Sequence, residues 1–369
     1  MTLCEADRRL LDRAARWAVR GHGLVEPNPM VGCVLTDAKG RVRAMASHRC
    51  YGGPHAEILT LQQAGDLARN GTVHVTLEPC SHHGKTPPCV EALIRSGVAR
   101  VVIGARDPNP IACGGADQLR DAGIHVDFAN HAPSIKLIDP FRIRLLHKRP
   151  WITVKWAQTL DGKIATRSGD SRWISSRASR QLVHRERGRV DAILTGIGTV
   201  LQDDPQLTAR HVRRRRIATR IVLDRALRTP LNSALISTVE VAPLLIVTDR
   251  SRLESQEAQA LRSRGAVIVG RDVVSGRFDI PSLMQELHRS HGIATMMVEA
   301  GTGLMSDMVR SGCADELAIF MAPRLMADSE GFPPLSEDVV RTIADARRVR
   351  LDHVHRRDMD VLFRCKIEN

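Results

Sequence analysis

The sequence predicts an α/β protein with two domains, a three-layer α/β/α domain followed by a second α/β domain. The chain has 369 residues, more than twice a nominal domain of about 150. Strand and helix signals alternate along it, which is typical of sheets covered by helices on both faces. Periodicity is poor from 131 to 150, so we expect a hinge there that ends in His-Lys-Arg-Pro. The predicted domains are residues 1–147 and 148–369.

In the first domain, hydrophobic spacing and turn residues define the elements. Apolar residues at helical spacing predict a helix over 6–19. The segment 30–47 predicts two strands around a turn at 37–40. Proline at the start of 87–97 and glycine at its end are typical of a helix. The other expected elements are a helix from about 55, strands over 72–79, 100–105 and 125–129, and a helix over 114–123.

The second domain is expected to begin with a strand over 151–157 and a helix over 176–188. Its further strands are predicted at 192–197, 219–224, 243–249, 266–270, 295–300 and 316–322, with helices over 282–292 and 303–312. A β-hairpin is predicted over 348–367. The basic run 213–216 lies between two of these strands, so we expect a solvated loop there.

The composition favours small anionic ligands. Lys and Arg number 54 against 41 Asp and Glu, which gives a net charge of +13. A basic chain favours nucleic acid, an acidic membrane surface or phosphorylated small molecules. Six Phe, four Trp and one Tyr offer few stacking platforms for a single-stranded nucleic acid. We therefore expect a phosphorylated small molecule and no nucleic acid as partner.

Targeting signals and a disulfide framework are not expected. No apolar run approaches the ~20 residues that cross a bilayer, and the charged N-terminus lacks the apolar core of a signal peptide. We therefore expect a cytoplasmic protein with no membrane partner. Without a secretory signal, a disulfide framework is not expected, and most of the eight scattered cysteines are expected to be buried apolar residues. The exceptions are Cys80 and Cys89.

Three zinc ligand types accompany a glutamate in the first domain. His55 stands at a predicted helix start, Cys80 follows a strand, and Cys89 opens a helix whose N-terminus favours a thiolate. One imidazole and two thiolates leave the fourth zinc position for water. Glu57 lies about 200° around the helix from His55, so we expect it to shuttle a proton rather than bind the metal.

This constellation matches the zinc deaminase signature, His-x-Glu followed by Pro-Cys and a second Cys. A catalytic zinc would bring the pKa of water from 15.7 to about 7. Two alternatives stay open. A closed structural zinc site would take His82, His83 or Cys50 as fourth ligand, and in the second alternative all three residues belong to an ordinary core.

In the second domain, the segment Glu299–Gly303 joins a predicted strand to a helix. Glycines there let backbone N–H groups approach a pyrophosphate, although the full dinucleotide-binding fingerprint is missing. Arg187 and Arg210 flank a glycine-rich strand region, and arginine forks suit phosphate.

Further motifs extend over both halves of the chain. The segment 79–89 separates the two cysteines by eight residues, where the usual deaminase signature has two. The other motifs are PNPMVGCVL at 27–35, GGPHAE at 52–57, DPNP at 107–110, KWAQTLDGKIA at 155–165, SRWISS at 171–176, AILTGIGTVLQDDPQLTAR at 192–210 and VEAGTGL at 298–304. Together they resemble the bifunctional riboflavin-biosynthesis deaminase/reductase. The resemblance implies a cytidine-deaminase-like first domain and a dihydrofolate-reductase-like second domain.

The resemblance implies hydrolytic deamination of 2,5-diamino-6-ribosylamino-4(3H)-pyrimidinone 5′-phosphate, followed by NADPH reduction of the ribosyl group to ribityl. It assigns one zinc per chain to His55, Cys80 and Cys89, and the proton shuttle to Glu57. The positions that match substrate contacts are Asn28, His48, His83 and Lys85. Read alone, Asn28 is also typical of a turn, and His83 and Lys85 of a solvated loop.

For the second domain, the resemblance assigns substrate contacts to Ser171, Arg187, Leu207, Arg210 and Glu299. The matching cofactor positions are Ala157, Trp173, Thr199, Asp203, Gly301, Thr302, Gly303, Leu304, Met305, Ser306 and Asp307. The choice of NADPH rests on the resemblance alone.

Two departures from the family pattern bear on these contacts. Ile-Ala-Cys-Gly-Gly-Ala at 111–116 replaces a Gly-Lys-Gly element, and Arg225 stands where the family often has Ser. One cofactor contact is therefore expected to differ. We further expect a homo-oligomer, a dimer or a tetramer. The alternatives are a nucleic-acid or nucleoside base deaminase with an inactive second domain, and a non-enzyme with structural zinc.

Overall fold

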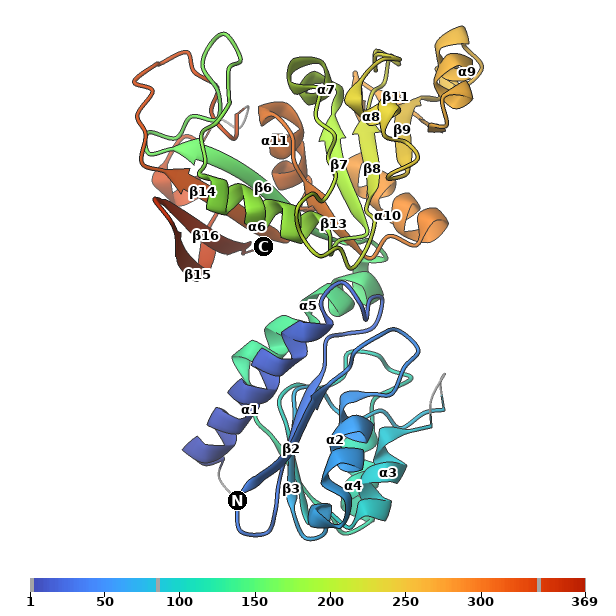
Figure 1. Cartoon of the computed structure of the whole chain (residues 1–369), viewed down its shortest axis with the longest axis vertical. Coiled ribbons are helices and arrows are strands. Elements are labelled where there is room, and N and C mark those ends of the chain that lie inside the picture. The colour runs from blue at the N-terminus through green and yellow to red at the C-terminus, as the bar shows by residue number, and fades with distance from the viewer. Residues whose placement is uncertain (1–2, 84–86, 337–339, 369) are drawn as a thin grey trace. The chain divides into compact units, whose positions relative to one another are not determined.

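The structure is a computed structural model that describes residues 3–83, 87–336 and 340–368. The chain divides into two compact units, Met1–Lys148 and Arg149–Asn369 (Figure 1). The division falls inside the His-Lys-Arg-Pro segment at 147–150. Each unit has a sheet and a hydrophobic core of its own.

The first unit is built on a five-stranded sheet in the order β2-β1-β3-β4-β5. Its strands are β1 (Gly32–Thr36), β2 (Val42–Ser47), β3 (Thr72–Val75), β4 (Arg100–Ile103) and β5 (His125–Phe128). β1 is antiparallel to both β2 and β3, whereas β3, β4 and β5 are parallel. The carboxyl ends of these three parallel strands therefore meet at one edge of the sheet.

Helices cover both faces of this sheet (Figure 1). On one face lie α1 (Glu5–Ala18) and α5 (Ala132–His147), and on the other α2 (Ala56–Ala64), α3 (Cys89–Ser96) and α4 (Gly115–Asp121). Two short 3-10 helices, η1 (Val19–Gly21) and η2 (Gly65–Ala68), follow α1 and α2. The three-layer α/β/α prediction is confirmed.

The hinge expected over 131–150 is wrong, because this segment forms α5, a helix of 16 residues. The helix signal in the sequence is weak here because Pro140 lies inside the segment, and an interior proline lacks the N–H that a helix uses. The helix forms nevertheless, because Leu137, Ile138 and Ile143 are buried and α5 packs on α1. Tertiary packing here overrides local propensity.

The second unit holds a nine-stranded sheet in the order β10-β9-β8-β7-β13-β6-β14-β16-β15. The strands are β6 (Trp151–Thr159), β7 (Ala192–Gly196), β8 (Thr219–Leu223), β9 (Leu244–Asp249), β10 (Val267–Arg271), β13 (Thr295–Val298), β14 (Glu316–Ala322), β15 (Val349–Arg357) and β16 (Asp360–Ile367). From β10 to β14 all neighbours are parallel, and the C-terminal hairpin β15–β16 adds two antiparallel strands. The predicted strands and hairpin are confirmed.

Two apolar layers cover this sheet. One contains α10 (Ile280–His291) and α11 (Thr302–Arg310), and the other contains α6 (Arg177–Arg187), α7 (Ile197–Asp203), α8 (Ala234–Ser237) and α9 (Gln256–Ser263). The helices α7, α8 and α9 were not predicted, because they have only seven, four and eight residues and short helices carry a weak periodic signal. The small pair β11 (Val273–Val274) and β12 (Arg277–Phe278), and the 3-10 helices η3 (Arg250–Arg252) and η4 (Ile343–Asp345), complete the unit.

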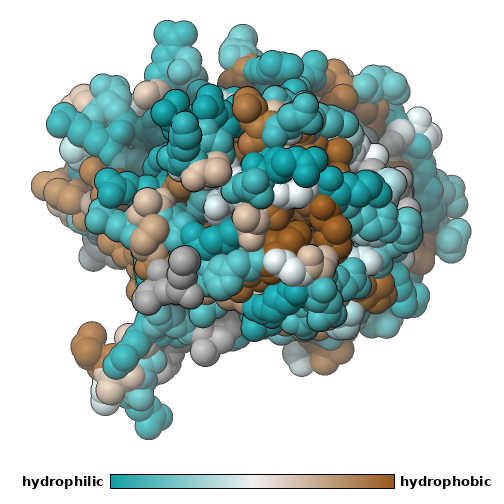
Figure 2. Space-filling model, turned by 90° about the horizontal axis from the view of Figure 1, so that it is seen from below, coloured by the Kyte–Doolittle hydropathy of each residue, from teal (hydrophilic) through white to brown (hydrophobic). Residues whose placement is uncertain are grey.

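On the face shown in Figure 2, hydrophobic residues form small separate patches among hydrophilic ones. Within the described residues, none of the helices combines the length and the apolar character needed to span a bilayer.

Candidate active sites

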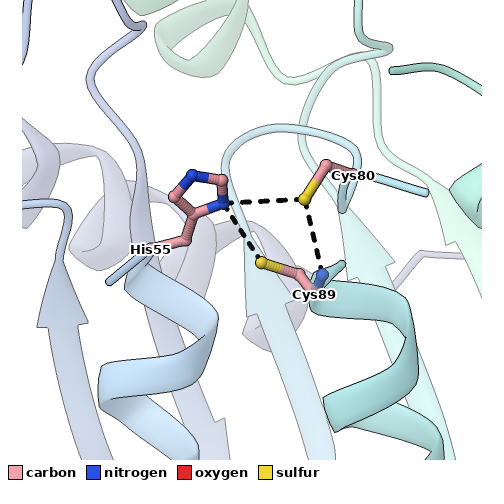
Figure 3. Close-up of side chains that lie close together, drawn as sticks. All are labelled: His55, Cys80 and Cys89. Atoms are coloured by element: carbon pink, nitrogen blue, oxygen red, sulfur yellow. Dashed lines mark hydrogen bonds between the residues drawn. The ribbon is translucent and has the colours of Figure 1, made fainter. Parts of the chain in front are cut away.

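The ligand atoms of His55, Cys80 and Cys89 point at one another (Figure 3). His55 Nδ1 lies 3.2 Å from Cys89 Sγ and 3.6 Å from Cys80 Sγ, and all three ligand atoms lie within 4.8 Å of one another. Tetrahedral zinc with ordinary bond lengths would hold such nitrogen and sulfur atoms about 3.5 Å apart. The three side chains therefore fit a zinc ion with little movement.

Local structure explains how these side chains meet. His55 is the N-cap of α2 and Cys89 is the first residue of α3. Cys80 follows β3 and accepts a hydrogen bond from the Cys89 backbone N–H at 3.4 Å. Two helix N-termini thus converge on one point, and their positive ends favour thiolates there.

The hydrogen bonds in the cluster favour charged forms of two ligands. The bond with the Cys89 thiol, together with the His55 ring, lowers the pKa of Cys80 to about 4. The Cys80 sulfur in turn raises the pKa of His55. Cys80 is therefore a thiolate at neutral pH, which is the form that binds zinc.

Glu57 lies beside the cluster without belonging to its ligand set. The side chain is buried on the first turn of α2, and burial raises its pKa. The Glu57 carboxylate is among the groups that raise the pKa of Cys89, so it lies near that thiol, and its Oε2 atom has no partner among the described residues. A buried carboxyl group with a free oxygen at this place is suited to take up and release a proton.

The other predicted residues of the first unit differ in placement. His48 is buried, and its ring stands edge-on to that of His55 with centroids 5.3 Å apart. His48 Nδ1 lies 3.0 Å from the Pro54 carbonyl, and Nε2 has no partner among the described residues. Asn28 is half-buried in the loop before β1. Lys85 lies outside the described residues.

His83 lies in an exposed ion pair, with its Nε2 atom 3.2 Å from Glu91 Oε1. His83 is therefore exposed on the segment between Cys80 and Cys89. Among the described residues, the cluster that could hold a metal includes none of His82, His83 and Cys50. None of these three side chains therefore supplies a fourth ligand to the cluster, as the closed-site alternative required.

Sequence reasoning missed Glu78, which fixes the loop beside Cys80. Its buried carboxylate accepts backbone N–H bonds from Asp107 at 3.3 Å and from Gly114 and Ala116 at 3.2 Å. Gly115 has no side chain because a Cβ atom there would lie 1.9 Å from the Pro79 carbonyl oxygen. The start of α4 thus packs directly on the segment that carries Cys80.

A buried charge cluster marks the second unit. Arg187 donates two hydrogen bonds to Glu299, from Nε to Oε1 at 2.6 Å and from Nη2 to Oε2 at 3.0 Å. Lys155 Nζ lies 3.6 Å from Glu299 Oε2. Burial alone would raise the pKa of Glu299, but Arg187 and Lys155 outweigh it and lower the pKa to about 2. The cluster therefore holds two cations and one anion, a net charge of +1.

The remaining predicted substrate residues lie on two segments. Arg187 Nη1 donates to the Thr208 carbonyl at 3.3 Å, which places the loop of Leu207 and Arg210 against this cluster. Leu207 is buried, whereas Arg210 is exposed. Ser171 is among the groups that act on the pKa of Asp203, so one predicted substrate residue lies near one predicted cofactor residue.

The predicted cofactor residues gather at the carboxyl ends of β7 and β13. Gly301 is the N-cap of α11, and a Cβ atom there would lie 4.0 Å from Thr199 Oγ1. Two helix N-termini thus face the same edge, which is where α/β sheets bind nucleotides. Met305 and Ser306 are buried, and Asp307 is paired with Arg277 and Arg310. Ala157 is half-buried on β6, Trp173 is exposed, and Thr302 donates to the Pro333 carbonyl.

Both units of the chain match known enzyme families. Residues 4–105 match the cytidine and deoxycytidylate deaminase zinc-binding region, and residues 150–363 match the RibD C-terminal domain. The chain is therefore an enzyme with a zinc-binding deaminase domain and a reductase domain, which implies zinc and a nucleotide cofactor. The predicted fold class is confirmed.

Several known proteins are similar to the chain over nearly its whole length. The riboflavin biosynthesis protein RibD of Aquifex aeolicus is 37% identical over 97% of this chain and 98% of its own length, and that of Escherichia coli is 34% identical over 96% and 98%. The structure of Acinetobacter baumannii RibD has a TM-score of 0.82 at 32% identity and covers 99% of both chains. A diaminohydroxyphosphoribosylaminopyrimidine deaminase/5-amino-6-(5-phosphoribosylamino)uracil reductase of Thermotoga maritima has a TM-score of 0.82 at 33% identity, covering 98% of this chain and 99% of its own.

The chain belongs to the RibD family of bifunctional deaminase/reductases of riboflavin biosynthesis. The resemblance drawn from the sequence motifs is thereby confirmed. A nucleic-acid base deaminase with an inactive second domain is not favoured, because the match extends over both units.

Proposed function

We propose that the chain catalyses two consecutive steps on one phosphorylated pyrimidine. The first unit hydrolyses the 2-amino group of 2,5-diamino-6-ribosylamino-4(3H)-pyrimidinone 5′-phosphate and releases ammonia. The second unit uses NADPH to reduce the ribosyl group of the product to ribityl. The observation that carries this proposal is the three-ligand cluster with the buried Glu57 carboxyl group beside it. The Thermotoga maritima relative is named for these two activities.

In the first step, His55, Cys80 and Cys89 hold one zinc ion. When bound, zinc supplies a Lewis acid that lowers the pKa of a water ligand toward neutrality. The chain's own contribution is the geometry, because the three ligand atoms already lie within 4.8 Å of one another and Glu57 is buried beside them. The N-terminal ends of α2 and α3 stabilise the negative charge of the sulfur ligands.

Glu57 moves the protons of the first step. Its free Oε2 atom accepts a proton from the attacking water, and the same oxygen then delivers a proton to the leaving amino nitrogen. Burial raises the pKa of this carboxyl group, which suits a group that must both accept and donate near neutral pH. His48 and Asn28 orient the ring and the sugar, His48 through its unpaired Nε2 atom.

In the second step, NADPH would supply a hydride. Gly301 and the N-terminal N–H groups of α11, with Thr199 beside them, would hold its pyrophosphate. Arg187, Glu299 and Lys155 orient the sugar of the substrate. Lys155 is the proton source for the reduced sugar, since burial lowers its pKa and makes it a stronger acid.

The domains are residues 1–147 for deamination and 148–369 for reduction. We further propose that the enzyme is a homo-oligomer and acts in the cytoplasm. These assignments follow from the family membership and from the sequence features above, and gel filtration with light scattering tests the oligomeric state.

A two-step assay with metal analysis tests the proposed function. Purified protein is expected to contain about one zinc per chain. It should release ammonia from the diaminopyrimidinone nucleotide without NADPH and oxidise NADPH only after deamination. Ammonia release from transfer RNA or free nucleosides, but not from this nucleotide, would contradict the proposal.

A further inference from the structure

The second unit contains an open cleft of about 690 Å³, and Arg210 is the one residue lining it that the substrate contacts predicted above include. The segment 206–214 forms one wall, and Thr238 and Val241 lie on the other. Arg210, Arg213 and Arg214 line it, and none of its lining residues is Asp or Glu. The cleft is therefore strongly basic.

A fourth arginine lies beneath the same cleft. Arg220 is fully buried, and its Nη1 atom donates to the Gln206 carbonyl at 3.2 Å and to Thr238 Oγ1 at 2.6 Å. Nη2 donates to the Thr238 and Ala242 carbonyls. Gln206 and Thr238 lie on opposite walls of the cleft, so the Arg220 guanidinium connects the two walls through hydrogen bonds.

The charge of Arg220 is not balanced inside the protein. Its partners are all neutral, its Nε atom has no hydrogen-bond partner, and no carboxylate in the described part of the chain pairs with it. Only burial acts on its pKa, which falls to about 10, so the group stays charged at neutral pH. An unpaired buried charge is costly, and an anion above it would offset that cost.

The arginines on the wall are likewise unbalanced. Arg210 Nη1 donates to two neutral oxygens, Gln206 Oε1 at 2.7 Å and Thr208 Oγ1 at 3.4 Å. Arg213 and Arg214 are exposed and have no ion pair within the described residues. By contrast, Arg216 of the same run pairs with Asp191, and Arg187 with Glu299. The unpaired arginines of this region are those that face the cleft.

We propose that this cleft is a phosphate-binding site, in which Arg213 and Arg214 hold the phosphate oxygens, Arg210 lies at the rim and Arg220 lies beneath the floor. Guanidinium forks bind phosphate in a bidentate manner. The site goes beyond the contacts proposed above, because Arg213, Arg214 and Arg220 have no part in them. The phosphate belongs either to the substrate itself, a source that rests on the proposed function, or to a second phosphate-bearing molecule.

Calorimetric titration of the full-length, zinc-loaded protein with inorganic phosphate at constant ionic strength tests the site. Replacing both wall arginines, Arg213→Ala with Arg214→Ala, should weaken phosphate binding by ~10-fold or more, since each removes a charge-assisted hydrogen bond. The matched control, Arg262→Ala with Arg264→Ala, removes the same charge outside the cleft and should bind like the parent. If the alanine variant is poorly folded, Arg213→Gln with Arg214→Gln replaces it.

Three results would overturn the proposal: no phosphate binding by the parent protein, unchanged binding by the double variant, or equal weakening by the control. Kinetics then separate the two sources. A higher KM for the phosphorylated substrate of the reduction, but not for its dephosphorylated form, identifies the substrate's own phosphate. An unchanged KM with lost phosphate binding identifies a second molecule. If the parent binds phosphate but shows neither activity, the proposed function fails and the anion site stands.

Discussion

The two candidate sites are assembled in opposite ways. The metal cluster of the first unit joins one imidazole and two thiol side chains that come from two helix N-termini and one loop. The charge cluster of the second unit joins Arg187, Lys155 and Glu299, which already neutralise one another in part. The first site therefore needs a cation to be complete, whereas the second keeps its form without a ligand and attracts an anion.

This difference predicts how each site responds to damage. A donor set around a metal acts as a unit, so losing one component should abolish deamination. An ion cluster is held by many partners, so a single loss should weaken reduction and also destabilise the unit that contains it. The predictions below test this contrast.

Zinc removal has the largest expected effect. Chelation followed by dialysis should abolish ammonia release, while NADPH oxidation on the deaminated substrate continues. The circular dichroism spectrum should stay close to that of the holoprotein, because the first unit has a core of its own that does not include the metal site. Added zinc should restore deamination. Unfolding of the first unit on chelation would instead support a closed structural site.

Replacement of the proton shuttle, Glu57→Gln, should lower the rate of ammonia release by 10²–10⁴-fold, the usual contribution of a general acid–base group. Zinc content should be unchanged, because Glu57 is not a ligand. Reduction of the deaminated substrate serves as the internal control. Ammonia release at a near-normal rate would remove the assignment of Glu57.

The sequence alone predicted the metal cluster more completely than the residues that depend on distant parts of the chain. His55, Glu57, Cys80 and Cys89 lie within 35 residues, and all but Cys80 lie where a helix begins, so a local pattern contains the site. Glu78 escaped because its role depends on N–H groups of residues 107–116, which only the fold brings near. Arg220 was missed for the same reason, since only the fold shows that this side chain of β8 is fully buried.

The charge cluster should respond to Glu299→Gln with a weaker reduction, a rise in KM of ~10-fold or more, because Arg187 and Lys155 lose the carboxylate that orients them. Deamination should be unaffected. The control is the double variant Arg289→Gln with Glu286→Gln, which removes an ion pair on the surface of α10. Equal loss of both activities would indicate misfolding.

Glu299 should also make the stability of the second unit depend on pH. The pKa of Glu299 falls from 4.5 to about 2 on folding, so its contribution to stability is present above pH 4.5 and is lost as the pH falls toward 2. Integration over that range gives about 3 kcal/mol. Acid unfolding of the second unit should therefore be less steep in Glu299→Gln than in the parent between these pH values. Identical acid profiles would show that the carboxylate is not paired in solution.

The smallest effect is expected at Glu78, which acts on the metal cluster only by positioning. In Glu78→Gln, the amide NH₂ group would face one of the N–H groups that the carboxylate now accepts, and the segment from Glu78 to Cys80 would shift. Groups that orient a ligand in this way are typically worth 10–100-fold in metal affinity or activity, so we expect zinc to bind ~10-fold more weakly.

Competition with a chromophoric chelator measures the zinc affinity of Glu78→Gln. Excess zinc should restore kcat, which would separate positioning from a direct role. Asp117→Asn, on the exposed side of α4, is the matched control and should bind zinc like the parent. Unchanged zinc affinity in Glu78→Gln would mean that the cluster keeps its geometry without this anchor, and that the ends of α2 and α3 alone position it.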